Sequence, residues 1–171
     1  MTATVETSER ADLVQSLDRH RFFLRQTLRD VSEEQARQRS TVSELTLAGL
    51  VKHVSFVERN WARFITAGPA ALGGNTEADY ARHFDSFQPG PADTVAGLLA
   101  AYDQVAAETD ELVRTLPSLD ASQPLPPAPW FSPGARWTAR RVLLHIIAET
   151  AQHAGHADII REALDGAKTM G

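Results

Sequence analysis

The sequence predicts an all-α protein built as a bundle of four long amphipathic helices. Apolar residues recur near the helical period in four separate stretches, and no alternating pattern typical of strands competes with them. Glycine and proline gather in the segments between those stretches, where a chain turns. A length of 171 residues is enough to bury a substantial core, so we expect one domain over residues 1–171.

Two helical segments are expected in the first 40 residues. The first long helix is predicted over about residues 8–30, because Ser8 suits an N-cap and apolar residues from Leu13 to Leu28 follow helical spacing. The stretch VSEEQARQRS comes next, and we expect it to form a short helical turn. These segments form the N-terminal part of the predicted bundle.

The second long helix is expected to start between residues 43 and 46 and to run to about residue 67. Thr41 and Glu44 match the pattern of a capping box at its start, and the Gly-Pro pair that follows it stops it. Residues 70–91 contain several glycines and prolines. This composition predicts a long connection without a helix of its own.

The third long helix is expected over about residues 92–116, where Pro117 ends it. Residues 119–136 contain five prolines and cannot form a regular helix. We expect this Pro-rich loop to cross one end of the bundle as a stiff segment that carries Trp130 and Phe131. Its expected role is to close that end of the bundle, and we assign it no peptide-binding partner.

Composition and charge exclude several classes of protein. The net charge is −5 and the lysines and arginines are scattered, so no basic face for nucleic acid is expected. The N-terminus carries acids where a secretory signal has bases, and no 18 apolar residues occur together, so we expect a cytoplasmic protein with no membrane partner. The absence of cysteine excludes disulfides and a protein thiol nucleophile. Any thiol chemistry must therefore use an external thiol.

The last helix, expected from an N-cap at Thr138 to a stop at Gly166, carries the most informative pair of residues. Glu149 and His153 lie four residues apart, so both side chains leave the same helix face one turn apart. On a helical wheel they lie about 20° to either side of Val142, at the centre of the apolar face. A carboxylate there needs a proton or a cation, because desolvating a charge costs several kcal/mol.

His53 offers a third ligand from the margin of the apolar face of the second helix. It completes a metal site with Glu149 and His153 only if the two helices pack together, and a fourth position then stays open, as in catalytic sites. Two other interpretations stay open at this point. Glu149 and His153 form a hydrogen-bonded pair in one, and His53 is a packing histidine in the other.

Other residues on these faces have two interpretations each. His145 and His156 lie on the polar edge beside the pair and are expected to contact the ligands, or else to be solvated. Glu58 is expected to pair with an arginine on a neighbouring helix, with a role in the site as the alternative. The three tryptophans, which could wall a substrate pocket, are more often used to fill a core; they are Trp61, Trp130 and Trp137.

At these residues the sequence resembles a known family. The pattern HxxxE followed by HAGHADIIRE, with LAGLVKHVSFVERNW upstream, is similar to the actinobacterial branch of the DinB-like superfamily, which includes mycothiol-dependent maleylpyruvate isomerases and thiol S-transferases. The resemblance covers about residues 45–166. It implies an up-down-down-up four-helix bundle with a divalent metal held by His53, Glu149 and His153. Many DinB-like proteins have His at the position of Glu149, whereas the isomerase-like members have Glu.

The resemblance implies a metal-dependent thiol S-transferase that uses mycothiol as its co-substrate with a small electrophile. It implies one divalent ion, for which we expect zinc, with nickel, cobalt and manganese as alternatives. In such a mechanism His145 or His156 would orient a ligand or relay a proton. Arg140 and Arg161 would hold an anionic group of the thiol or substrate, with surface salt bridges as the alternative.

Three other functions remain open from the sequence. An isomerase related to the maleylpyruvate enzymes would recycle the thiol instead of consuming it. A non-enzymatic protein would bind a metal or small ligand at an intact site, and a purely structural bundle would bind no metal. The electrophile and the oligomeric state are not set by the sequence, and a homodimer is one state that it allows.

Overall fold

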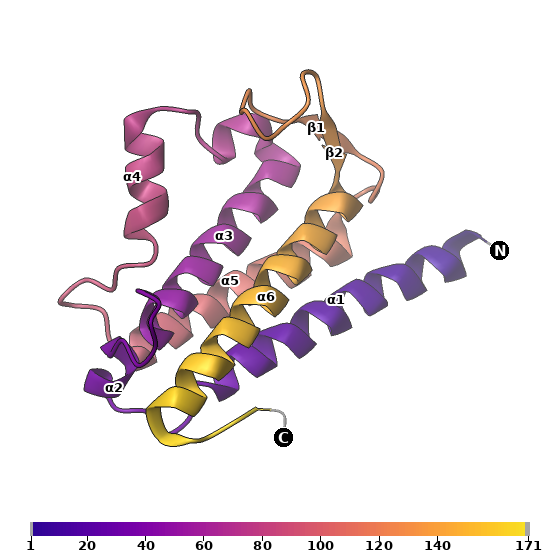
Figure 1. Ribbon diagram of the computed structural model, residues 1–171. Coiled ribbons are helices and arrows are strands. Elements are labelled where there is room, and N and C mark those ends of the chain that lie inside the picture. Colours follow the sequence, from indigo (N-terminus) through magenta and orange to yellow (C-terminus); the bar gives the residue numbers. More distant parts are fainter. Residues whose placement is uncertain (1, 170–171) are drawn as a thin grey trace.

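The computed structural model describes residues 2–169, with side chains from residue 9 onward, and its architecture is the predicted all-α bundle. The four long helices are α1 (Thr2–Gln26), α3 (Leu47–Ala67), α5 (Val95–Thr115) and α6 (Ala139–Asp165). In Figure 1, α3 and α5 run in one direction, and α1 and α6 run in the other. The expected up-down-down-up order is therefore confirmed.

The predicted ends of the last helix and the short turn after the first helix are confirmed. Thr138 is the N-cap of α6, where its side chain accepts a hydrogen bond from the Arg141 amide. Gly166 ends α6 in the left-handed region with a φ of 79°, a conformation that glycine adopts without strain. The predicted turn is α2 (Glu33–Arg37), which starts with a capping box at Ser32.

The predicted start of the first long helix and the predicted capping residues of the second need correction. Helix α1 begins at Thr2, so Ser8 lies within it, and it ends at Gln26 because the chain turns through Asp30 at a φ of 57°. The expected capping box at Thr41 is wrong. The N-cap of α3 is Thr46, whose side chain accepts a hydrogen bond from the Gly49 amide, whereas Thr41 accepts one from the Ser43 amide in the preceding turn.

The stretch expected to be a connection contains two further helices, which corrects that prediction. They are the 3₁₀ helix η1 (Gly68–Ala71) and α4 (Glu77–Asp85). Helix α4 buries none of its residues, although Tyr80, Ala81 and Phe84 follow helical spacing; the glycines and prolines on either side of this short helix led to the expectation of a plain connection. Figure 1 shows it standing beside the bundle, next to α3.

The Pro-rich loop is not helical, as predicted, and includes a small antiparallel sheet that was not expected. Strand β1 (Ser122–Pro124) pairs with β2 (Arg136–Thr138), and Ser122 lies opposite Thr138. The loop between these strands crosses one end of the bundle, near the start of α6 (Figure 1). Its expected position at the end of the bundle is confirmed.

The apolar core of the bundle falls into two clusters, one toward α2 and one toward the β1–β2 sheet. Along α1, Leu24 belongs to the first cluster and Leu17 to the second, and Arg21 lies between them. No helix within residues 2–169 is long and apolar enough to cross a membrane.

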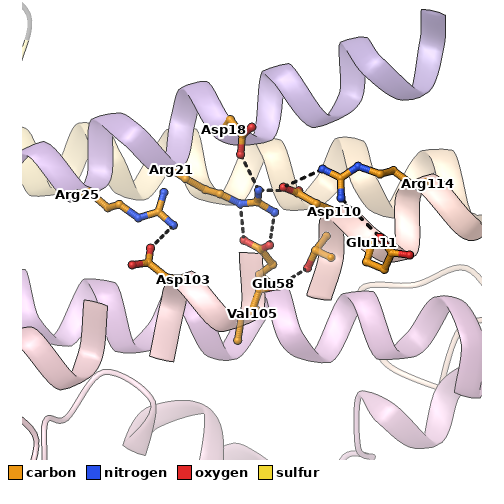
Figure 2. A network of polar contacts seen from close by, with 10 residues as sticks. Asp18, Arg21, Arg25, Glu58, Asp103, Val105, Asp110, Glu111 and Arg114 are labelled. Atoms are coloured by element: carbon orange, nitrogen blue, oxygen red, sulfur yellow. Dashed lines mark hydrogen bonds and ion pairs between the residues drawn. The ribbon is translucent and has the colours of Figure 1, made fainter. Parts of the chain in front are cut away.

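A buried polar network lies between the two clusters (Figure 2). The Arg21 guanidinium is fully buried and donates to both oxygens of Glu58, from Nη2 to Oε1 at 2.5 Å and from Nε to Oε2 at 3.3 Å. Its Nη1 donates to Asp18 at 3.0 Å and to Asp110 at 2.8 Å. The prediction that Glu58 pairs with an arginine on a neighbouring helix is therefore confirmed. The network joins α1, α3 and α5.

Candidate metal centre

The packing of α3 against α6 brings the three predicted ligands together. One ligand atom each from His53, Glu149 and His153 lies within 4.8 Å of the other two. The imidazole centroids of His53 and His153 are 4.9 Å apart, and Nε2 of His153 lies 3.6 Å from Oε2 of Glu149. Two imidazole nitrogens and a carboxylate oxygen at these separations could hold a divalent ion.

Ser86 holds the imidazole of His53 in one tautomer. The Ser86 hydroxyl donates its proton to the carbonyl oxygen of His83 at 2.5 Å, so its oxygen accepts from Nδ1–H of His53 at 2.8 Å. The proton of the neutral ring therefore sits on Nδ1, and Nε2 keeps a free lone pair. Metal-binding histidines commonly donate their other ring nitrogen in this way. The donor set of this centre thus fits a metal ion.

Phe87 packs against the imidazole of His53 and fixes the plane of that ring. Its side chain stacks on His53 with centroids 3.6 Å apart and planes inclined by 14°. The close approach depends on Gly49 of α3, because a Cβ there would lie 2.3 Å from the carbonyl oxygen of Phe87. His53 is consequently only 2% exposed, so it is a core residue and not the marginal one that the wheel indicated.

The electrostatics of the centre favour the forms that bind metal. Burial, with repulsion from His153 and His83, lowers the pKa of His53 to about 3, so its imidazole is neutral at pH 7. The polar contact with His153 holds the pKa of Glu149 below its ordinary value, so that carboxylate is ionised. Burial lowers the pKa of His145 as well. A neutral imidazole and an ionised carboxylate are the ligand forms that a metal requires.

The two further histidines of α6 lie next to the ligands. Nε2 of His145 is 3.7 Å from Oε1 of Glu149. Nδ1 of His156 is 3.4 Å from Nδ1 of His153, and one of these two nitrogens must donate to the other. Neither contact uses Oε2 of Glu149 or Nε2 of His153, the two atoms that face each other across 3.6 Å. The prediction that these histidines contact the ligands is consistent with these distances.

Arg140 and Arg161 are engaged away from the centre. Arg140 forms ion pairs with Glu9 and Asp120. Arg161 is buried and donates from Nη1 to carbonyl oxygens near the end of α1 and from Nε to Asp165. The ion pairs of Arg140 are the surface salt bridges of the alternative interpretation, whereas Arg161 is buried and matches neither interpretation. A role of either arginine in thiol binding stays a prediction that none of these contacts supports.

A cavity of about 230 Å³ opens beside the centre, with His53 and Glu149 in its wall. Two of the three tryptophans, Trp61 and Trp130, line it. The third, Trp137, instead stacks on Trp61 with centroids 4.9 Å apart and supports it from outside the cavity. The cavity is walled by α3, the segment before α4, and the Pro-rich loop; its other lining residues are Phe56, Val57, Asn60, Leu72, Gly73, Gly74, Asn75, His83, Pro126, Ala128 and Phe131.

The comparison with protein families identifies the chain. A family model described as mycothiol-S-transferase matches residues 12–166, a range that includes all three candidate ligands. The chain belongs to the mycothiol-S-transferase family. It is therefore an enzyme, a transferase that uses mycothiol, and the expected DinB-like relationship is confirmed. A search of curated proteins found no match to the chain.

In this mycothiol-S-transferase family member, sequence reasoning missed His83, Ser86 and Phe87. All three belong to α4 or the turn after it, a stretch that was expected to be a plain connection. The signal that could have found α4 is Thr76-x-x-Asp79, a capping box that the structure confirms. The packing of that helix end onto His53 has no local sequence signature.

Proposed function

We propose that this transferase binds one divalent ion, zinc by preference, through His53, Glu149 and His153, and uses it to conjugate mycothiol to a small electrophile. The observation that carries the proposal is the convergence of these three ligand atoms within 4.8 Å, at the wall of a cavity. A bound divalent ion of this kind stabilises a thiolate at neutral pH and so supplies the nucleophile that a chain without cysteine lacks.

Three neighbouring side chains hold the ligands in place in this proposal. Ser86 keeps Nε2 of His53 unprotonated, and His156 contacts Nδ1 of His153. Nε2 of His145 lies 3.7 Å from Oε1 of Glu149, beside the carboxylate that it would orient. Neither His145 nor His156 lines the cavity, so both are positioning residues here rather than residues that touch the substrate.

The metal assignment is tested by replacing one ligand and one matched control. We expect His153→Ala to retain metal at no more than about a tenth of the wild-type level after dialysis, because it removes one of three ligands. His20→Ala, on α1, removes a histidine that packs on Phe23 and is not one of the three ligands, so it should keep full occupancy. Elemental analysis of untagged protein gives both values. Full metal retention by His153→Ala would show that these residues are not the ligands.

The thiol assignment is tested separately with the cobalt-loaded protein. Adding mycothiol should change the absorption spectrum of the cobalt ion, and conjugation to an electrophile should require both metal and thiol. A cobalt spectrum that mycothiol leaves unchanged, with no conjugate formed, would disprove thiol activation at this centre.

A further inference from the structure

We propose that the cavity beside the metal centre selects an uncharged aromatic electrophile, and that Trp130 is the surface on which its ring stacks. The proposal rests on the function proposed above and names the class of its second substrate. Three properties of the cavity carry it: the charge of its wall, its aromatic lining, and its size.

The described wall of the cavity has no permanently cationic side chain. Among the described residues that line it, none is lysine or arginine, and the one acidic residue is Glu149. Arg82 lines a neighbouring depression and forms an ion pair with Asp79. A divalent ion would be balanced by Glu149 and one thiolate, so no charge would remain for a carboxylate on the electrophile. Burying an unpaired carboxylate costs several kcal/mol.

The lining offers aromatic faces and neutral hydrogen-bonding groups instead. Trp130 is 63% exposed although it lies at a cavity, so its ring has surface left to bury on a ligand. Its loop is attached to the segment before α4 by a hydrogen bond from the Asn75 amide to the carbonyl oxygen of Pro127. The Asn60 side chain lines the same cavity and can donate to a nitro or carbonyl oxygen.

The size of the cavity suits one substituted ring. An apolar cavity of roughly 150 Å³ binds benzene, so the volume of about 230 Å³ here leaves room for a ring with two or three small substituents. With 1-chloro-2,4-dinitrobenzene as the electrophile, the sulfur forms a bond to the ring carbon that carries chlorine. The carbon–chlorine bond then breaks, chloride leaves with the electron pair, and the thiol proton passes to solvent.

The binding test uses two unreactive rings that differ by one carboxylate. Calorimetric titration of the metal-loaded protein with mycothiol present should show 1,3-dinitrobenzene binding at least about tenfold more tightly than 3,5-dinitrobenzoate. Trp130→Ala should weaken dinitrobenzene binding by about fivefold or more, as loss of an aromatic contact does. Phe84→Ala removes an equally exposed aromatic ring of α4 that does not line this cavity, and should leave binding unchanged. Equal affinity for the two rings, or equal effects of the two variants, would overturn the proposal.

A variant that adds a positive charge to the cavity wall should shift the preference toward the charged ring. Asn60→Arg places a guanidinium in the cavity wall, where it can pair with a carboxylate, and should raise the relative kcat/KM for 4-chloro-3,5-dinitrobenzoate over 1-chloro-2,4-dinitrobenzene by at least about tenfold. The wild-type enzyme should have a higher kcat/KM for the neutral ring than for the carboxylate, and this measurement does not depend on a variant that folds. Selective binding of dinitrobenzene without any conjugation would refute the proposed function alone, whereas conjugation without preference for the neutral ring would refute this inference alone.

Discussion

Helix α3 contributes to two clusters of ionisable residues, and they differ in whether their charges are matched. Glu58 faces Arg21, a cation that donates to both of its oxygens in the network of Figure 2. Five residues earlier, His53 faces Glu149 and His153, and no lysine or arginine forms an ion pair with this carboxylate in the described residues. The first cluster is complete within the protein, whereas the second presents lone pairs to a space that a cation would fill.

The comparison shows that burial has opposite outcomes for the pKa of Arg21, which is paired within the protein, and for the pKa of His53, which lies in the candidate metal centre. Burial disfavours the charged form of Arg21, yet Glu58 and Asp110 outweigh it, so the pKa of Arg21 lies above its ordinary value. At His53, burial, together with repulsion from His153 and His83, outweighs the attraction of Glu149 and keeps the ring neutral, which preserves a ligand. A buried charge that has its countercharge is satisfied within the protein, whereas a buried neutral imidazole beside a carboxylate indicates a ligand site.

The largest effect is expected from breaking the matched cluster. Glu58→Gln leaves the buried Arg21 without its main countercharge and should lower the free energy of unfolding by about 3 kcal/mol, measured by urea denaturation. The double variant Arg21→Met/Glu58→Leu removes both charges and should lose less. Metal content should be unchanged in both. If Glu58→Gln has the wild-type free energy of unfolding but loses its metal, Glu58 belongs to the metal centre instead.

Removing the metal tests the unmatched cluster and should have a smaller effect on stability. The chelated protein should keep its helical circular dichroism, because the two apolar clusters and the Arg21 network do not depend on the ion. It should melt at a lower temperature, since an ion at a hundred times its Kd adds about 2.7 kcal/mol of stability. Collapse to a coil on chelation would show that the metal, not the core, holds this fold together.

The smallest effect is expected from the residue that orients His53. Ser86→Ala removes the acceptor for Nδ1–H and should weaken metal binding by about tenfold, at the lower end of the range for such contacts, with little change in helical content. Ser86→Thr keeps a hydroxyl and should restore most of the affinity. Competition with a chromogenic chelator measures both. If alanine and threonine behave alike, the hydroxyl has no part in holding the ligand.

The sequence alone determined the long helices and the pair on α6. Apolar periodicity is a local signal, and the i, i+4 spacing of Glu149 and His153 sets their common face whatever α6 packs against. The pairing of Glu58 was also predictable, because a carboxylate on an apolar face needs a partner. Which arginine it would meet was not, since Arg21 lies 37 residues away in the chain.

Only the tertiary structure decided how the site is completed. Helix α4 buries no residue of its own, and no pattern within this stretch sets where it packs, so the placement of Ser86 and Phe87 on His53 could not be predicted. The cavity could not be predicted from the sequence either, because its walls come from segments far apart in the chain. Arg161 shows the converse: its charge suited an anion, but packing of α6 beside α1 placed it against backbone carbonyls. Residue type and spacing limit what a side chain can do, and the contacts between helices select among those options.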